Sequence, residues 1–131
     1  MNAPQKRTLY ILFFAFIFSS GVFRLLVEML TQQARPPSPP ETLAAMRTLC
    51  YAMAGVVLLI SIGWTLLRTA RSNTFPQFQT NMIVSLALSE ACSIFGLLLF
   101  LLGGSAGEFN RFAIASVLVD LIFILPTLTR R

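Results

Sequence analysis

The chain has 131 residues, of which 56% are hydrophobic and 11% are charged, and its formal net charge is +5 with no histidine. A soluble domain carries about twice this share of charged residues, so the composition excludes an ordinary water-soluble domain and predicts an integral membrane protein. Basic residues flank long apolar blocks, as topology signals do, and no basic soluble face for nucleic acid is expected.

The two cysteines, Cys50 and Cys92, both lie within apolar runs. They are interpreted as small apolar residues rather than as a disulfide or a ligand pair. Without histidine or a CxxC motif, we expect no metal site and no cofactor.

The first apolar block, residues 9–30, follows a basic N-terminal segment. Small residues at positions 19–21 resemble a signal-peptide cleavage site, but the apolar pattern continues to Leu30. We therefore favour an uncleaved spanning helix over a cleaved signal. Arg24 and Glu28 are four residues apart near its far end, so they are expected to pair on one helix face.

The connection over residues 31–41 contains the proline-rich sequence RPPSPPE, which predicts an extended turn outside the bilayer. Pro40 then favours the start of a second helix, with a span over residues 43–67. Within this span Gly55 and Gly63 are eight residues apart on roughly one face. They are predicted to admit a closely packed neighbouring helix.

A polar connection over residues 68–81 leads to the third block, residues 82–104, which contains a single charge, Glu90. A short turn then precedes the fourth span, residues 112–128, which contains Asp120 and, near its exit, Pro126. The predicted fold class is all-α, with four transmembrane helices in one membrane domain over residues 1–131.

The distribution of basic residues predicts the orientation. The N-terminus, the 68–81 connection and the C-terminus together carry six lysines and arginines, whereas the other two connections carry two. The positive-inside rule then places both termini in the cytoplasm, and we expect the bacterial inner membrane.

Glu90 and Asp120 are the acids within the third and fourth spans. Each lies eight residues, or about 12 Å, from the start of its span, but on helices of opposite direction. We expect their depths to differ by about 6 Å in a bilayer of about 30 Å, so that they can share a polar spot. A buried carboxyl without a basic partner is expected to stay protonated, and it can load and release a proton when water reaches it. Alternatively, a neutral carboxyl hydrogen-bonds a neighbouring helix and only holds the bundle together.

The sequence around Glu90, SLALSEACSIFGLLL over residues 85–99, resembles the carboxylate helix of the rotary ATP synthase c subunit, the proteolipid. The resemblance implies that Glu90 is the ion-binding carboxylate and that Ser89, Ser93 and Phe95 shape its pocket. It also implies that the ion is a proton, because Ala91 and Cys92 stand where sodium-binding members carry hydroxyl ligands.

Two functions remain open at this stage. The first is a proteolipid-like membrane protein that handles protons through Glu90, with Asp120 as a possible second acid, as a homo-oligomer or with other membrane subunits. The second is a small accessory or structural subunit without transport activity. No nucleophile–base or metal constellation supports an enzyme.

Overall fold

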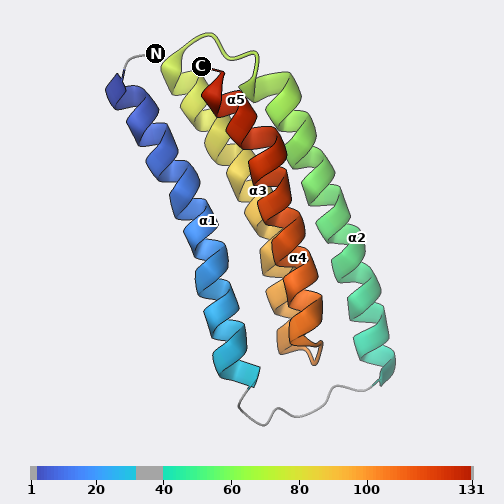
Figure 1. The fold of residues 1–131 in the computed structure, drawn as a ribbon. Helices are drawn as coiled ribbons and strands as arrows, with labels where there is room; N and C mark the ends of the chain where they lie inside the picture. Colours follow the sequence, from blue (N-terminus) through green and yellow to red (C-terminus); the bar gives the residue numbers. More distant parts are fainter. Residues whose placement is uncertain (1–2, 32–39, 131) are drawn as a thin grey trace.

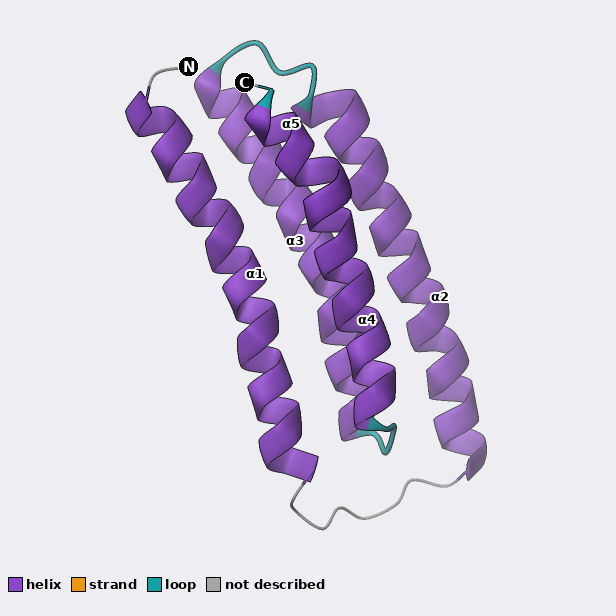
Figure 2. Cartoon of the chain, in the orientation of Figure 1, coloured by secondary structure: helices purple, strands orange, loops and turns teal. Residues whose placement is uncertain are grey.

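The computed structural model describes residues 3–31 and 40–130, and within these ranges it contains helices and short turns but no strand (Figure 2). The helices are α1 (Ala3–Thr31), α2 (Pro40–Trp64), α3 (Phe75–Leu101) and α4 (Ala106–Val119). A π-helical turn, η1 (Thr65–Thr69), extends α2, and a second, η2 (Asp120–Ile124), joins α4 to α5 (Leu125–Thr129). The prediction of an all-α chain is confirmed, and four helices are long and apolar enough to cross a membrane.

The helices extend beyond the predicted spans at several ends. The first begins at Ala3 and the third at Phe75, so part of the predicted polar connection over residues 68–81 is helical. The reason is local: the Thr74 side chain accepts a hydrogen bond from the Gln77 N–H at 3.4 Å, and Pro76 occupies the first turn. The second helix begins at Pro40 as expected, whereas the predicted proline-rich turn falls largely on residues 32–39, outside the described residues.

A glycine turn reverses the chain between α3 and α4. The N–H of Gly104 donates to the Leu99 carbonyl at 2.9 Å and the N–H of Gly103 to the Phe100 carbonyl at 3.1 Å, which closes the helix end. Gly103 has a φ of 117°, a conformation that other residues rarely adopt. Ser105 then caps α4 by accepting from the Glu108 N–H. The reversal sets α3 and α4 antiparallel and in contact.

Helix α3 lies at the centre of the bundle. It packs against α1, α2 and α4, and 50% of its most apolar segment is buried, compared with 17% for α1. Figure 1 shows α1 and α2 on opposite sides of the α3–α4 pair, with both described chain ends and the α2–α3 connection at the same end of the bundle. Four long helical segments that alternate in direction bring the two described ends together.

Two apolar clusters lie on either side of the bundle's middle, between α1, α3 and the continuous helical segment formed by α4, η2 and α5. Near the chain ends they include Leu9, Phe13, Phe78, Met82, Leu86, Ile124 and Leu128. Towards the α3–α4 turn they consist of Val27, Phe100 and Phe109 with their partly buried neighbours. Between these clusters the same three helices place polar side chains, so both clusters flank a polar layer along the bundle axis.

Close packing at Gly55 and Gly63 is not observed within the described residues, so their predicted packing role stays a prediction. A Cβ atom built at either position meets no atom within 4 Å, so no described helix of this chain approaches either glycine closely. The close approach occurs at Gly96 instead, where a Cβ would lie 2.5 Å from the Cβ of Phe112. The contact between α3 and α4 therefore requires a residue without a side chain at position 96. The face of α2 that carries Gly55 and Gly63 has no such requirement within this chain.

Candidate functional site: a polar layer between α1, α3 and α4

Glu90 lies two residues past the middle of α3 and is 7% exposed. Its hydrogen bonds go to α1: the Ser19 hydroxyl donates to Oε1 at 2.7 Å, and the Ser20 hydroxyl donates to Oε2 at 3.4 Å. The two hydroxyls take the place of water around a carboxyl group in an apolar bundle. Glu90 is therefore held by hydrogen bonds between α1 and α3.

Asp120 is the most deeply buried acid of the described chain, at 1% exposure, and neither of its carboxyl oxygens has a hydrogen-bond partner there. Ser89 and Glu90 lie within electrostatic reach of this carboxyl group. The Ser89 hydroxyl, however, is engaged with Ser116. An unsatisfied buried acid costs free energy unless it is protonated or solvated, so Asp120 is a candidate proton-binding group.

The backbone at Asp120 is also unusual. Its carbonyl accepts from the N–H of Leu125, five residues on, which opens the α-helix into the π-helical turn η2. Pro126 follows, and its missing N–H and bulky ring disturb the regular ladder of the preceding turn. The turn contacts η1, the π-helical turn of α2. Such turns occur frequently at functional sites.

Ser85 and Ser89 of α3 take part in interhelical hydrogen bonds. Ser89 and Ser116 bond reciprocally, because each hydroxyl donates to the other residue's backbone carbonyl, at 3.0 and 2.8 Å. One turn away, the Ser61 hydroxyl of α2 donates to the Ser85 carbonyl at 2.7 Å. Ser93 is fully buried, and its hydroxyl has no partner among the described residues.

Two grooves beside α1 reach the hydroxyls that hold Glu90. Ser20 lines a groove of about 390 Å³ between α1 and α4, and Ser19 lines a smaller one of about 180 Å³. Both grooves are open at the surface of the bundle, whereas apolar clusters flank the layer along the axis. Both grooves therefore approach Glu90 from the side of the bundle, each next to a serine that donates to it.

The structure brings some of the predicted site residues together. Glu90, Asp120 and Ser89 are near neighbours, and Ser93 lies one turn from Glu90 on the same helix. Phe95 does not shape this pocket: it packs against the cluster of Cys50, Ala54, Cys92, Leu99 and Phe112, on the side of α2. Five residues turn an α-helix by about 140°, which separates Phe95 from Glu90.

Sequence reasoning missed Ser19, Ser20 and Ser116 as partners of the α3 side chains. A signal for the first two was present. Helices α1 and α3 run parallel, and Ser19 and Glu90 lie 16 and 15 residues from their respective helix starts. At about 1.5 Å per residue they reach the same depth. Polar residues at matching depths of parallel helices would have identified the contact.

Within the described residues the site contains two acids and several hydroxyls, and no group of three or more metal-binding residues. Neither acid forms an ion pair with a basic residue in this part of the chain. Such a layer can hold a proton on a carboxyl group and exchange it through hydroxyls or water. No protein-family model, curated protein or solved structure matches the chain.

Proposed function

We propose that the chain is an integral membrane protein with both termini and the α2–α3 connection in the cytoplasm. Four long apolar helices and the excess of basic residues at one end support this orientation. The bacterial inner membrane stays a prediction.

We further propose that Glu90 binds and releases a proton within the membrane and that Asp120 is the second acid of the same site. The observation that carries this proposal is the setting of Glu90: a nearly buried carboxyl group whose hydrogen bonds come from two serine hydroxyls and not from a basic residue. Hydroxyl partners accommodate both the neutral and the ionised carboxyl group, because they can donate or accept. The unpartnered carboxyl group of Asp120, within electrostatic reach, supplies a second place for the proton.

The resemblance to the ATP synthase proteolipid supports Glu90 as the proton-binding residue. In this chain α1 covers Glu90, so the hydrogen-bonded site is complete within one copy. Assembly into a homo-oligomer or with other membrane subunits is part of the proposal but is not required by the geometry of the site.

The test is proton uptake by liposomes that contain the purified protein and an entrapped pH-sensitive dye, under an imposed potassium diffusion potential. We expect uptake with the wild-type chain and its loss in Glu90→Gln, because glutamine keeps the shape and hydrogen bonds but cannot ionise. Asp120→Asn should reduce the rate. Glu41→Gln is the matched control, since Glu41 is exposed in the first turn of α2.

A structural subunit is the second candidate, and the reciprocal bonds of Ser89 and Ser116 favour it, because they show polar groups used to join helices. If the wild-type chain gives no uptake while Glu90→Gln folds as well as the wild type, the proton proposal fails. The native mass of the protein, extracted gently from its own membrane, then decides between a ring of identical copies and a complex with other subunits. A ring of many copies supports the proteolipid-like assembly, and a complex with unrelated subunits supports the structural role.

A further inference from the structure

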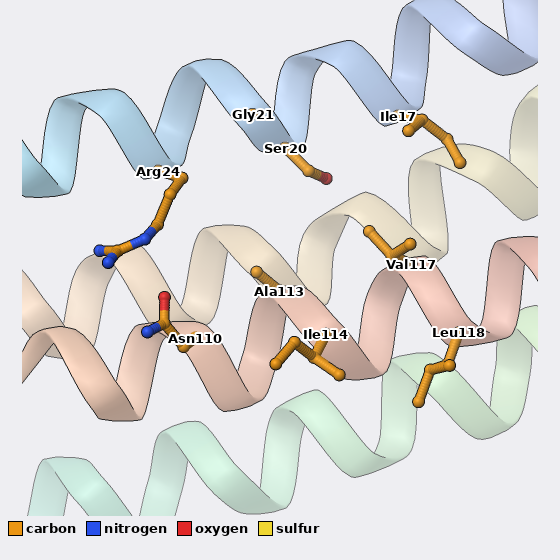
Figure 3. Close-up of a pocket in the computed structure, with 9 residues that line it drawn as sticks. All are labelled: Ile17, Ser20, Gly21, Arg24, Asn110, Ala113, Ile114, Val117 and Leu118. Atoms are coloured by element: carbon orange, nitrogen blue, oxygen red, sulfur yellow. The ribbon is translucent and has the colours of Figure 1, made fainter.

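The groove between α1 and α4 has a polar end and an apolar body (Figure 3). Its volume of about 390 Å³ lies within the range of about 300–1,000 Å³ that is typical of small-molecule sites. Most of the wall is aliphatic, formed by Ile17, Ala113, Ile114, Val117 and Leu118. The groove opens on the side of the bundle, where a membrane would place lipid.

The polar end lies towards the α3–α4 turn. Arg24 is seven residues from the end of α1, and Asn110 is four residues from the start of α4. These separations correspond to about 10 Å and about 6 Å along the helices. Figure 3 shows their polar groups pointing towards each other across the groove. The aliphatic wall continues to Ile17, the middle residue of α1, so the groove becomes apolar towards the centre of the bundle.

Arg24 has a donor that the chain does not use. One guanidinium nitrogen, Nη2, lies 3.4 Å from Glu28 Oε1, which confirms the predicted pair. The other, Nη1, is buried and has no acceptor among the described residues. Leaving a charged donor buried without an acceptor costs free energy, so this end of the groove suits an anionic oxygen.

We propose that the groove binds a phospholipid, with the phosphate held by Arg24 and Asn110 and one acyl chain along the aliphatic wall. Guanidinium groups bind phosphate oxygens through charge-assisted hydrogen bonds. A lipid in the leaflet on the side of the α3–α4 turn has the same order of groups, from phosphate at the edge to hydrocarbon at the midplane. This inference rests on membrane insertion and does not require proton binding at Glu90, although Ser20, which donates to Glu90, also lines the groove.

Gly21 provides the room for the acyl chain. It lines the groove, and a Cβ built there meets no atom within 4 Å. A larger side chain at this position would fill the groove without a clash at its own Cβ. Gly63 has equally open surroundings and is not among the residues that line this groove, which makes it a matched control.

The experiment is native mass spectrometry of the full chain, released from nanodiscs that contain phosphatidylglycerol and diacylglycerol. We expect the wild-type chain to retain phosphatidylglycerol and not diacylglycerol. Arg24→Gln should lower the lipid-bound fraction on the order of tenfold, since it removes a charge-assisted hydrogen bond. Gly21→Leu should lower it as well by occupying the groove. Arg71→Gln, an exposed charge change in the α2–α3 connection, and Gly63→Leu should retain lipid like the wild type.

Equal lipid retention in Arg24→Gln and Arg71→Gln would overturn the proposal, as would equal retention of diacylglycerol. A wild-type dimer that Gly21→Leu dissociates would assign the groove to a second copy of the chain. Glu90→Gln should bind lipid normally, so loss of proton uptake and loss of lipid are distinguishable. A chain that does not enter nanodiscs at all would instead contradict membrane insertion.

Discussion

At the scale of single residues, Ser19 and Ser20 hold Glu90 unequally. The hydrogen bond from Ser19 is 2.7 Å long, whereas that from Ser20 is 3.4 Å and near the limit for such a bond. The shorter bond satisfies one oxygen of a carboxyl group that water barely reaches. Ser19 is therefore expected to contribute more to the stability of the α1–α3 contact.

Replacing each serine by alanine tests this difference. We expect Ser19→Ala to lower the free energy of unfolding by about 1–3 kcal/mol, because it leaves a buried carboxyl oxygen unsatisfied. Ser20→Ala should cost less. Thermal unfolding in detergent, followed by circular dichroism, provides the comparison. A larger loss in Ser20→Ala than in Ser19→Ala would contradict the assignment.

At Gly96 the packing of α3 against α4 leaves no room for a side chain. In Gly96→Ala the new Cβ would meet the Cβ of Phe112, which cannot rotate away, so α3 and α4 must separate. We expect destabilisation by about 1–3 kcal/mol. In the control, Gly63→Ala, the methyl group meets open space and the higher helix propensity of alanine should leave stability unchanged or slightly raised. Equal melting temperatures of the two variants would refute the close approach.

At the scale of the elements, the antiparallel α3–α4 pair combines close packing with paired serines. The Ser89 and Ser116 hydroxyls each bond a backbone carbonyl on the opposite helix. Alanine at one position removes its own hydroxyl but leaves its carbonyl available to the other serine. The two bonds are thus independent in geometry, although the hydroxyl oxygens lie 3.1 Å apart.

A double-mutant cycle measures this independence. Ser89→Ala and Ser116→Ala should each cost about 0.6 kcal/mol and at most about 1.7 kcal/mol, the average and the maximum for interhelical hydrogen bonds in a membrane protein. Because the two hydroxyls donate to separate carbonyls, the double variant should lose about the sum, with a coupling below the value of about 0.5 kcal/mol from which side chains in contact show interaction. Unfolding by increasing denaturant in mixed micelles supplies the four free energies. A coupling well above that value would show that the bond between the two hydroxyls dominates.

At the scale of the whole molecule, the described chain ends and the α2–α3 connection share one end of the bundle. The positive-inside rule assigns that end to the cytoplasm. Native Cys50 and Cys92 are 2% and 1% exposed, so they should react poorly with a thiol reagent in the folded protein. New cysteines at exposed positions can therefore report on orientation.

Asn73→Cys and Glu41→Cys place a thiol at opposite ends of the bundle. In intact cells a membrane-impermeant maleimide should label Glu41→Cys and should label Asn73→Cys only after the membrane is opened. The reverse pattern would invert the proposed orientation. Labelling of both in intact cells would contradict insertion with four crossings.

The sequence by itself determined the helices and the polar residues within them. Long uncharged blocks can satisfy their backbone groups only as helices in an apolar medium, so number, order and approximate bounds were predictable. The acids were equally visible, because a charged residue inside such a block is rare. These features depend on local composition, which a single sequence records.

Only the tertiary structure decided which side chains meet. The rotation of each helix about its axis brought Ser19 and Ser20 to Glu90, turned Phe95 towards α2, and made Gly96 rather than Gly55 or Gly63 the point of close approach. In an apolar medium the hydrophobic pattern along a helix does not fix that rotation, because lipid and protein interior are similarly apolar. Packing and interhelical hydrogen bonds fix it instead, and both depend on residues far apart in the chain.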